Sequence, residues 1–179
     1  MGPLLAAAVR EAFEVRGIDP AARLDLLKEV VVEQLTSTDG VLNSSMLEDA
    51  FGRFMGELHS WVEDNPKAAG VAAKAVGQLA AQGHISLGPC LRPILEAKGS
   101  GGGGDGEEGE AGELPPLVES GVAGHDILAN VLQAAVDAGG ADKAAELWRS
   151  SGLEAAKFFD MEEDAEALAG RFAFLAAAS

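Results

Sequence analysis

Apolar side chains recur along this chain at the spacing of an α-helix, and this periodicity limits its possible folds most strongly. The broadest stripe lies between residues 46 and 62 and comprises Met46, Leu47, Ala50, Phe51, Phe54, Met55, Leu58, Trp61 and Val62. Ser45, with Glu48 three residues later, predicts a capping box at the start of this helix. No segment alternates apolar and polar residues with the period of a strand. The sequence therefore predicts an all-α fold with this helix in its core.

Start and stop signals predict further helices in the first half of the chain. Asp19-Pro20 opens a helix over 20–35, and Asn65-Pro66 opens one that runs to Gln82 and ends at Gly83 in the left-handed conformation. A short helix is expected from about Leu87, entered through Ser86 and limited by Pro89 and Pro93. Because alanine dominates the apolar residues and aromatic residues make up only 5%, these helices are expected to pack closely.

The second half of the chain shows the same pattern. We expect a helical pair, 126–138 and 141–149, joined at Gly139-Gly140, and a last helix over 162–177. Between the halves, residues 99–113 consist of glycine and acidic residues with nothing apolar larger than Ala111. Such a segment buries too little surface to offset the entropy of ordering, so it predicts a disordered loop. The simpler interpretation of this loop is a spacer, and the alternative is an acidic arm that binds a basic partner.

These signals divide the chain of 179 residues into a helical-repeat domain over 1–98, a disordered loop over 99–115 and a helical extension over 116–179 that packs on the repeat. Two turns share a glycine, an apolar residue and a serine cap, namely 40–44 and 83–86, and their glycines lie 43 residues apart. That spacing falls within the period of about 40–47 residues of HEAT and armadillo hairpins. Stacked helical hairpins of this kind usually serve as binding modules.

Charge and cysteine content limit the function further. The formal net charge is −16, with 29 acidic and 13 basic residues, so a surface that binds nucleic acid directly is not expected. The single cysteine, Cys90, cannot form an internal disulfide, and no apolar run near the start is long enough to cross a membrane. We therefore expect a cytoplasmic protein without a membrane anchor.

Candidate catalytic groups are few. Three histidines, His59, His84 and His125, accompany Cys90, but no spacing typical of a zinc site occurs, and no orienting group is marked for a Cys-His pair. The glycine segment lacks the Gly-Lys-Ser/Thr ending of a phosphate-binding loop. The acidic residues at the start of the last helix, Glu162, Glu163, Asp164 and Glu166, are attributed to capping and solvation, and Trp148, Leu147, Phe158 and Phe159 to packing. No enzyme activity, metal or cofactor is expected.

Two patches resemble a known family. The run Val62-Glu-Asp-Asn-Pro66-Lys-Ala, followed by an apolar helix and Gln82-Gly83-His-Ile-Ser86, resembles the Asp-x-Pro … Asp/Glu-Gly-x-Leu pattern of the MI domain, also written MA-three. This family is an atypical HEAT-like module of the translation initiation scaffold eukaryotic initiation factor 4 gamma and of programmed cell death protein 4. The run 143–153, with its Leu-Trp-Arg and Gly-Leu, and Lys157-Phe-Phe are similar to the segment that follows this domain in the scaffold.

The resemblance implies a non-catalytic module that docks the DEAD-box RNA helicase initiation factor 4A, alongside other initiation-complex proteins. The family's opening helical pair has no counterpart in residues 1–40, so the implied MI domain is partial, with an uncovered apolar face. One family contact loop transfers onto Glu63, Asp64 and Lys67, which are the expected partner-binding residues. The alternatives are a helical-repeat adaptor or translation regulator that binds no helicase, and a small helical hydrolase using His84 and Cys90.

Overall fold

The computed structural model describes residues 43–97 and 114–176. The expected helix over 20–35, the turn at Gly40 and nearly all of the expected disordered loop lie outside these residues. The described chain forms only helices and turns, with no strand, and the all-α prediction is confirmed for it. The helices are α3 (Ser44–Glu57), α4 (His59–Val62), α5 (Lys67–Ala81), α6 (Leu87–Glu96), α7 (Pro116–Glu119), the π-helix η1 (Ala123–Leu128), α8 (Ala129–Ser151), the 3-10 helix η2 (Ala155–Phe158) and α9 (Glu162–Arg171).

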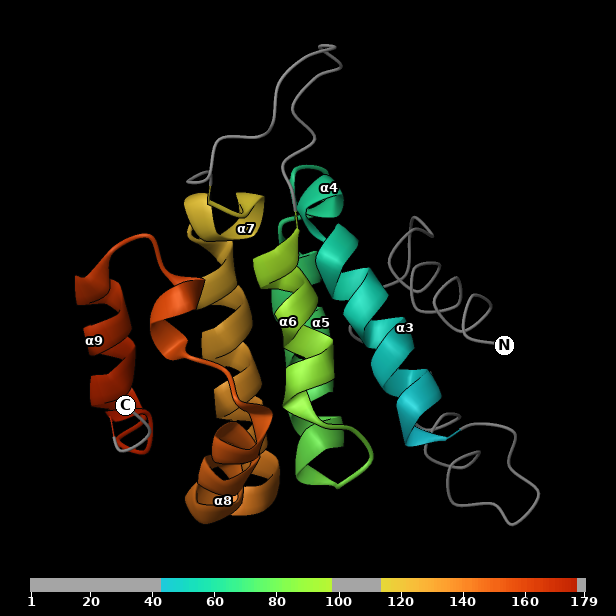
Figure 1. The fold of residues 1–179 in the computed structure, drawn as a ribbon, viewed down its shortest axis with the longest axis vertical. Coiled ribbons are helices and arrows are strands. Elements are labelled where there is room, and N and C mark those ends of the chain that lie inside the picture. Colours follow the sequence, from blue (N-terminus) through green and yellow to red (C-terminus); the bar gives the residue numbers. More distant parts are fainter. Residues whose placement is uncertain (1–42, 98–113, 177–179) are drawn as a thin grey trace.

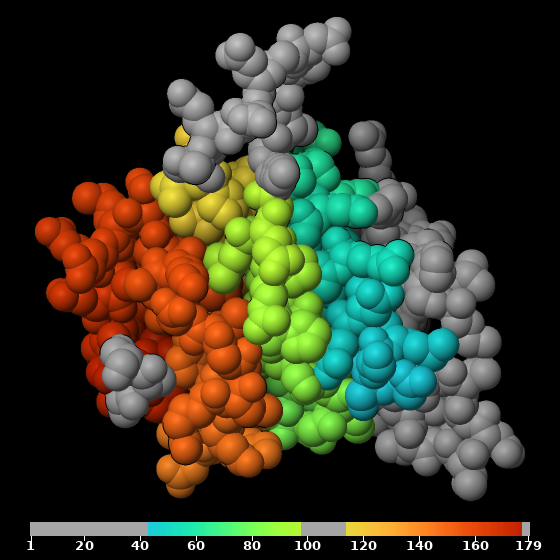
Figure 2. Space-filling model, in the orientation of Figure 1, coloured from blue at the N-terminus to red at the C-terminus, as the bar shows by residue number. Residues whose placement is uncertain are grey.

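The longer helices stand roughly side by side, from α3 through α6 and α8 to α9, with α5 behind α6 (Figure 1). The principal contacts join α5 to α8 and α3 to α6. Side chains fill the spaces between the ribbons on the face shown in Figure 2. The largest fully buried side chains come from both halves of the chain: Phe51, Leu47, Met55, Leu58, Leu79, Leu87, Leu91, Ile94, Ile127, Leu128, Trp148 and Phe158. One core therefore unites the segments before and after residues 98–113.

Neither principal contact joins helices that are consecutive along the chain. Of the two predicted repeat turns, the described residues include the one at Gly83, which has a positive φ of 81° as predicted. Glycine adopts this conformation without the steric cost of a Cβ. A HEAT-like stack of hairpins with a period of forty-odd residues remains a prediction.

The start of α3 differs from the expected capping box. The N-cap is Asn43, whose side-chain oxygen accepts the N–H of Met46 at 2.9 Å, and Ser45 lies inside the helix. Glu48 accepts a hydrogen bond from the backbone N–H of Ser86 at 2.7 Å, at the start of α6. The prediction of Ser45 as the cap was wrong because Asn43 occupies that position and Glu48 turns to a helix 38 residues away. The expected helix over 46–62 divides at Leu58, whose N–H bonds to Met55 three residues back.

The prolines do not limit α6, which runs to Glu96 with Pro93 inside it. Pro89 lies in the first turn, where a missing N–H leaves no intrahelical bond unmade. Pro93 cannot donate to the carbonyl of Pro89, and a Cβ built on Gly52 of α3 would lie 2.7 Å from that oxygen. Glycine therefore lets α3 approach α6 at the proline turn, and α6 runs without a break through this turn.

The helical pair predicted around Gly139-Gly140 is present, and Gly140 forms the kink between its halves, with φ 83° and ψ 166°. The first half begins earlier than expected, because η1 leads into α8 from Ala123. The last helix begins at Glu162 as predicted but ends at Arg171, short of residue 177. Phe172 leaves the helix and is buried with Leu175, so burial of these side chains explains the early end.

Within the described ranges, no helix has the length and apolar character needed to cross a bilayer.

Candidate functional site

The predicted partner-binding residues lie together on the turn between α4 and α5. Glu63 and Asp64 form the turn and Lys67 begins α5, and all three side chains are exposed. Backbone hydrogen bonds fix this turn, with the N–H of Asn65 donating to Trp61 at 2.9 Å and the N–H of Ala68 donating to Asn65 at 3.0 Å. The turn thus holds two carboxylates and one ammonium group on a defined backbone.

Apolar side chains on both sides of the turn attach it to the hydrophobic core. Trp61 and Val62 are half-buried and pack against the core, and Ala68 and Ala69 at the start of α5 are fully buried. No ion pair within the described residues engages Glu63, Asp64 or Lys67. Exposed charges on a rigid, anchored turn can contact a partner at little entropic cost.

Cys90 is fully buried in α6. Burial, and secondarily the carboxylate of Glu48, raises the pKa of the Cys90 thiol to about 12. The thiol is therefore protonated near neutral pH, whereas the thiolate is the nucleophile and the metal ligand. His84 lies half-buried in the turn before α6, and no hydrogen bond joins it to Cys90 in the described chain. This geometry gives no support to a Cys-His nucleophile.

The other two histidines lie on separate elements. His59 begins α4, and its Nδ1 lies 3.2 Å from the carbonyl oxygen of Gly56. His125, in η1, has its Nε2 3.4 Å from a carboxylate oxygen of Asp164 in α9. Its ring meets that of Phe159 edge to face at 5.4 Å. No group of three or more histidine, cysteine or acidic side chains suited to a metal occurs among the described residues.

The acidic residues of α9 do more than cap the helix. Glu162, Glu163 and Asp164 occupy its first turn as expected, where acids favour the positive end of the helix dipole. Asp164 also faces His125, and Glu162 and Glu166 border a hollow between the end of α8, η2 and α9. The prediction that Trp148, Phe158 and Phe159 serve packing is confirmed, because they are 2%, 0% and 8% exposed. Leu147 is partly buried against the same core.

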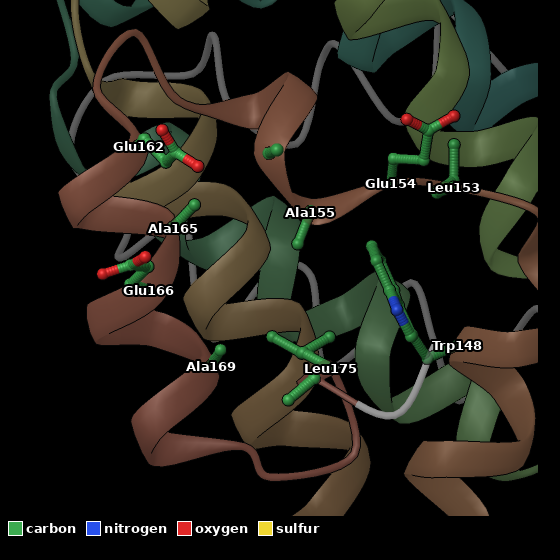
Figure 3. Close-up of a pocket in the computed structure, with 11 residues that line it drawn as sticks. Trp148, Leu153, Glu154, Ala155, Glu162, Ala165, Glu166, Ala169 and Leu175 are labelled. Atoms are coloured by element: carbon green, nitrogen blue, oxygen red, sulfur yellow. The ribbon is translucent and has the colours of Figure 1, made fainter. Parts of the chain in front are cut away.

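The sequence did not predict a hollow of about 650 Å³ between the end of α8, η2 and α9. Figure 3 shows Glu162, Ala165, Glu166 and Ala169 following one another along α9, opposite Trp148 and Leu153. The lining residues are Trp148, Leu153, Glu154, Ala155, Ala156, Glu162, Ala165, Glu166, Ala169, Leu175 and Ala176. The sequence contained one indication of this hollow. Positions 162, 165, 166 and 169 share one face of α9, and the two alanines among them leave space beside the two glutamates. This face alone did not show what would lie opposite it.

Searches with this chain found no matching protein-family model, no matching curated protein and no matching solved structure.

Proposed function

We propose that this chain is a non-catalytic protein-binding module whose α4–α5 turn docks a basic surface of its partner. The observation that carries this proposal is the placement of exposed Glu63 and Asp64 on a hydrogen-bonded turn anchored by Trp61 and Val62. Rigid presentation reduces the entropy lost on binding. The net charge of −16 adds a long-range attraction for a basic partner and raises the association rate most at low salt.

The proposed partner is the core of the DEAD-box RNA helicase initiation factor 4A, bound in the cytoplasm during cap-dependent translation initiation. This choice is supported by the likeness of residues 62–86 and 143–159 to the MI domain and to the segment that follows it. An acidic surface also suits a partner whose RNA-binding clefts are basic. We further propose that the helices stack as HEAT-like hairpins, which is supported by the spacing of 43 residues between Gly40 and Gly83.

The test is a direct binding measurement between the full chain and the purified helicase at low and high ionic strength. The double variant Glu63→Lys with Asp64→Lys should bind about tenfold more weakly at low salt, mainly through slower association. Its matched control is Asp142→Lys with Asp160→Lys. These two acids are exposed at other elements, and their reversal changes the net charge by the same amount.

Comparing the affinities of the two double variants distinguishes docking at the α4–α5 turn from attraction by the overall charge. Equal weakening by both double variants would reject the α4–α5 turn as the docking site, although attraction by overall charge would remain. A chain that stays folded and monomeric yet ignores the helicase at about micromolar concentration would favour a helical adaptor or translation regulator with another partner.

A further inference from the structure

The hollow between α8, η2 and α9 has an apolar interior and an acidic rim. Trp148 and Leu175 are 2% and 5% exposed, and they line it together with alanines of η2 and α9. Figure 3 shows the indole of Trp148 extending between Leu153 and Leu175. The volume of about 650 Å³ lies within the range of roughly 300–1,000 Å³ that is common for ligand pockets. An apolar group that enters this hollow would therefore contact mainly apolar side chains.

The charged side chains that border the hollow are all acidic. They are Glu154, Glu162 and Glu166, and the described residues that line the hollow include no lysine or arginine. Glu154 is paired with exposed Lys157 at 2.9 Å, so its charge is partly compensated. Glu162 and Glu166 form no ion pair within the described residues, and their spacing of four places them on one face of α9. Like charges at this spacing repel each other, and a cation placed between them would relieve that repulsion.

The indole of Trp148 adds a polar feature. Its N–H donates no hydrogen bond to any described residue, although the side chain is almost fully buried. In the described chain, every side-chain nitrogen or oxygen that is fully shielded from solvent has a hydrogen-bond partner. Because the N–H of Trp148 has no such partner, it must remain in contact with solvent. A backbone carbonyl of a bound peptide could accept this hydrogen bond. The hollow thus offers an apolar interior, a donor and two carboxylates that form no ion pair with a described residue.

We propose that this hollow is a docking site for a basic amphipathic segment of a partner protein. One bulky apolar side chain of the segment enters beside Trp148 and Leu175, and its flanking lysine or arginine residues meet Glu162 and Glu166. The α4–α5 turn lies on other elements of the fold, as Figure 1 shows, so this docking does not depend on the proposed binding of the helicase. It gives the module a second surface, for a peptide rather than for a folded domain.

The test uses the fluorescence of Trp148 in the full chain. The chain has two tryptophans, so the variant Trp61→Phe leaves Trp148 as the only one. The probe is a synthetic peptide of about 15 residues, roughly four helical turns, with leucine on one face and lysine on the other. Two further peptides replace every lysine with glutamine or with glutamate. We expect the lysine peptide to shift the emission of Trp148 in a saturable way, and the glutamate peptide to leave it unchanged.

Variants of α9 then separate the apolar and the charged contributions. Ala169→Leu places a larger side chain in the hollow and should weaken the lysine peptide at least tenfold, with helicity by circular dichroism as the check on folding. Glu166→Gln should weaken it about two- to fivefold at low salt. Glu163→Gln is the matched control, because Glu163 is exposed on the same helix but does not line the hollow, and it should have little effect.

Three results would overturn the proposal. The first is an emission that the lysine peptide leaves unchanged up to about millimolar concentration. The second is equal binding of the lysine and glutamine peptides, or equal weakening by Glu166→Gln and Glu163→Gln, because the charged rim would then play no part. The third is a change of Trp148 emission with protein concentration alone that Ala169→Leu removes, which would place a second copy of this chain in the hollow.

Discussion

The interface between α5 and α8 can be tested by adding one methyl group to each of two glycines of α5. Gly77 is buried against α8, and a Cβ at this position would lie 2.8 Å from the Cβ of Ala134 and closer still to the carbonyl oxygen of Val131. Gly70, two turns earlier on the same helix, would bring its Cβ only to 3.7 Å from the Asn130 side chain. Carbon contacts are normally about 3.5–4.0 Å long. Only the variant at Gly77 therefore forces the helices apart.

Replacing glycine with alanine inside a helix stabilises it by roughly 1 kcal/mol at either position, because alanine loses less backbone entropy on folding. Gly70→Ala should show this gain. At Gly77 the gain is offset by overpacking, which costs about 1–3 kcal/mol. We expect the upper end of that range, because a backbone carbonyl cannot rotate away as a side chain can. Gly77→Ala should then lower the free energy of unfolding by about 2 kcal/mol, and the two variants should differ by about 3 kcal/mol.

The assay is urea unfolding of both variants and the parent chain, followed by circular dichroism. The slope of the transition must be unchanged for the midpoints to report stability. For a chain of this length, a difference of about 3 kcal/mol also corresponds to roughly 6–12 °C in the thermal midpoint. If Gly77→Ala were as stable as Gly70→Ala, then α5 and α8 would not approach as closely at Gly77 as the structure shows, and the packing of the core between them would differ.

Two further predictions concern the ends and the interior of single helices. Asn43→Ala should lower the free energy of unfolding by about 1 kcal/mol, because the N–H of Met46 loses its acceptor. Ser45→Ala should change this free energy by less than about 0.5 kcal/mol. Urea unfolding measures both variants, and a larger effect at Ser45 than at Asn43 would favour the capping box instead. Burial raises the pKa of Cys90 from 9.0 to about 12, so the unfolded chain loses this proton first and stability should fall between these pH values by up to about 1.4 kcal/mol per unit. Unfolding as a function of pH for the parent chain and Cys90→Ala measures this, and parallel curves above pH 9.0 would contradict the buried, protonated thiol.

The helices themselves were largely readable from local signals. Asn65-Pro66 and Gly83 bracket α5 within a residue or two, and Gly140 was identified as the break in the second half. Each of these signals acts through its own backbone, since proline fixes φ and glycine permits a positive φ. One error arose where a side chain had a choice of partners. Glu48 could cap its own helix or reach α6, and only the packing of α3 against α6 decides in favour of Ser86.

The candidate sites divide in the same way. Glu63, Asp64 and Lys67 are neighbours in sequence, so their shared turn was predictable, and whether they bind a partner stays a prediction. The hollow was not predictable, because Trp148, Ala155 and Ala169 come from three elements whose meeting depends on how α9 folds back. The early end of α9 at Phe172 belongs to the same arrangement, since burial of Phe172 and Leu175 outweighs continuation of the helix.

The sequence by itself determined the helical class, the turns at Gly83 and Gly140 and the acidic character of the surface, because each follows from backbone preference or from charge count. Only the tertiary structure decided which helices face one another, which carboxylate caps which helix, and where an apolar space opens beside Glu162 and Glu166. These properties depend on contacts between residues far apart in the chain, and the periodicity of a single helix specifies its inward face without specifying what that face meets.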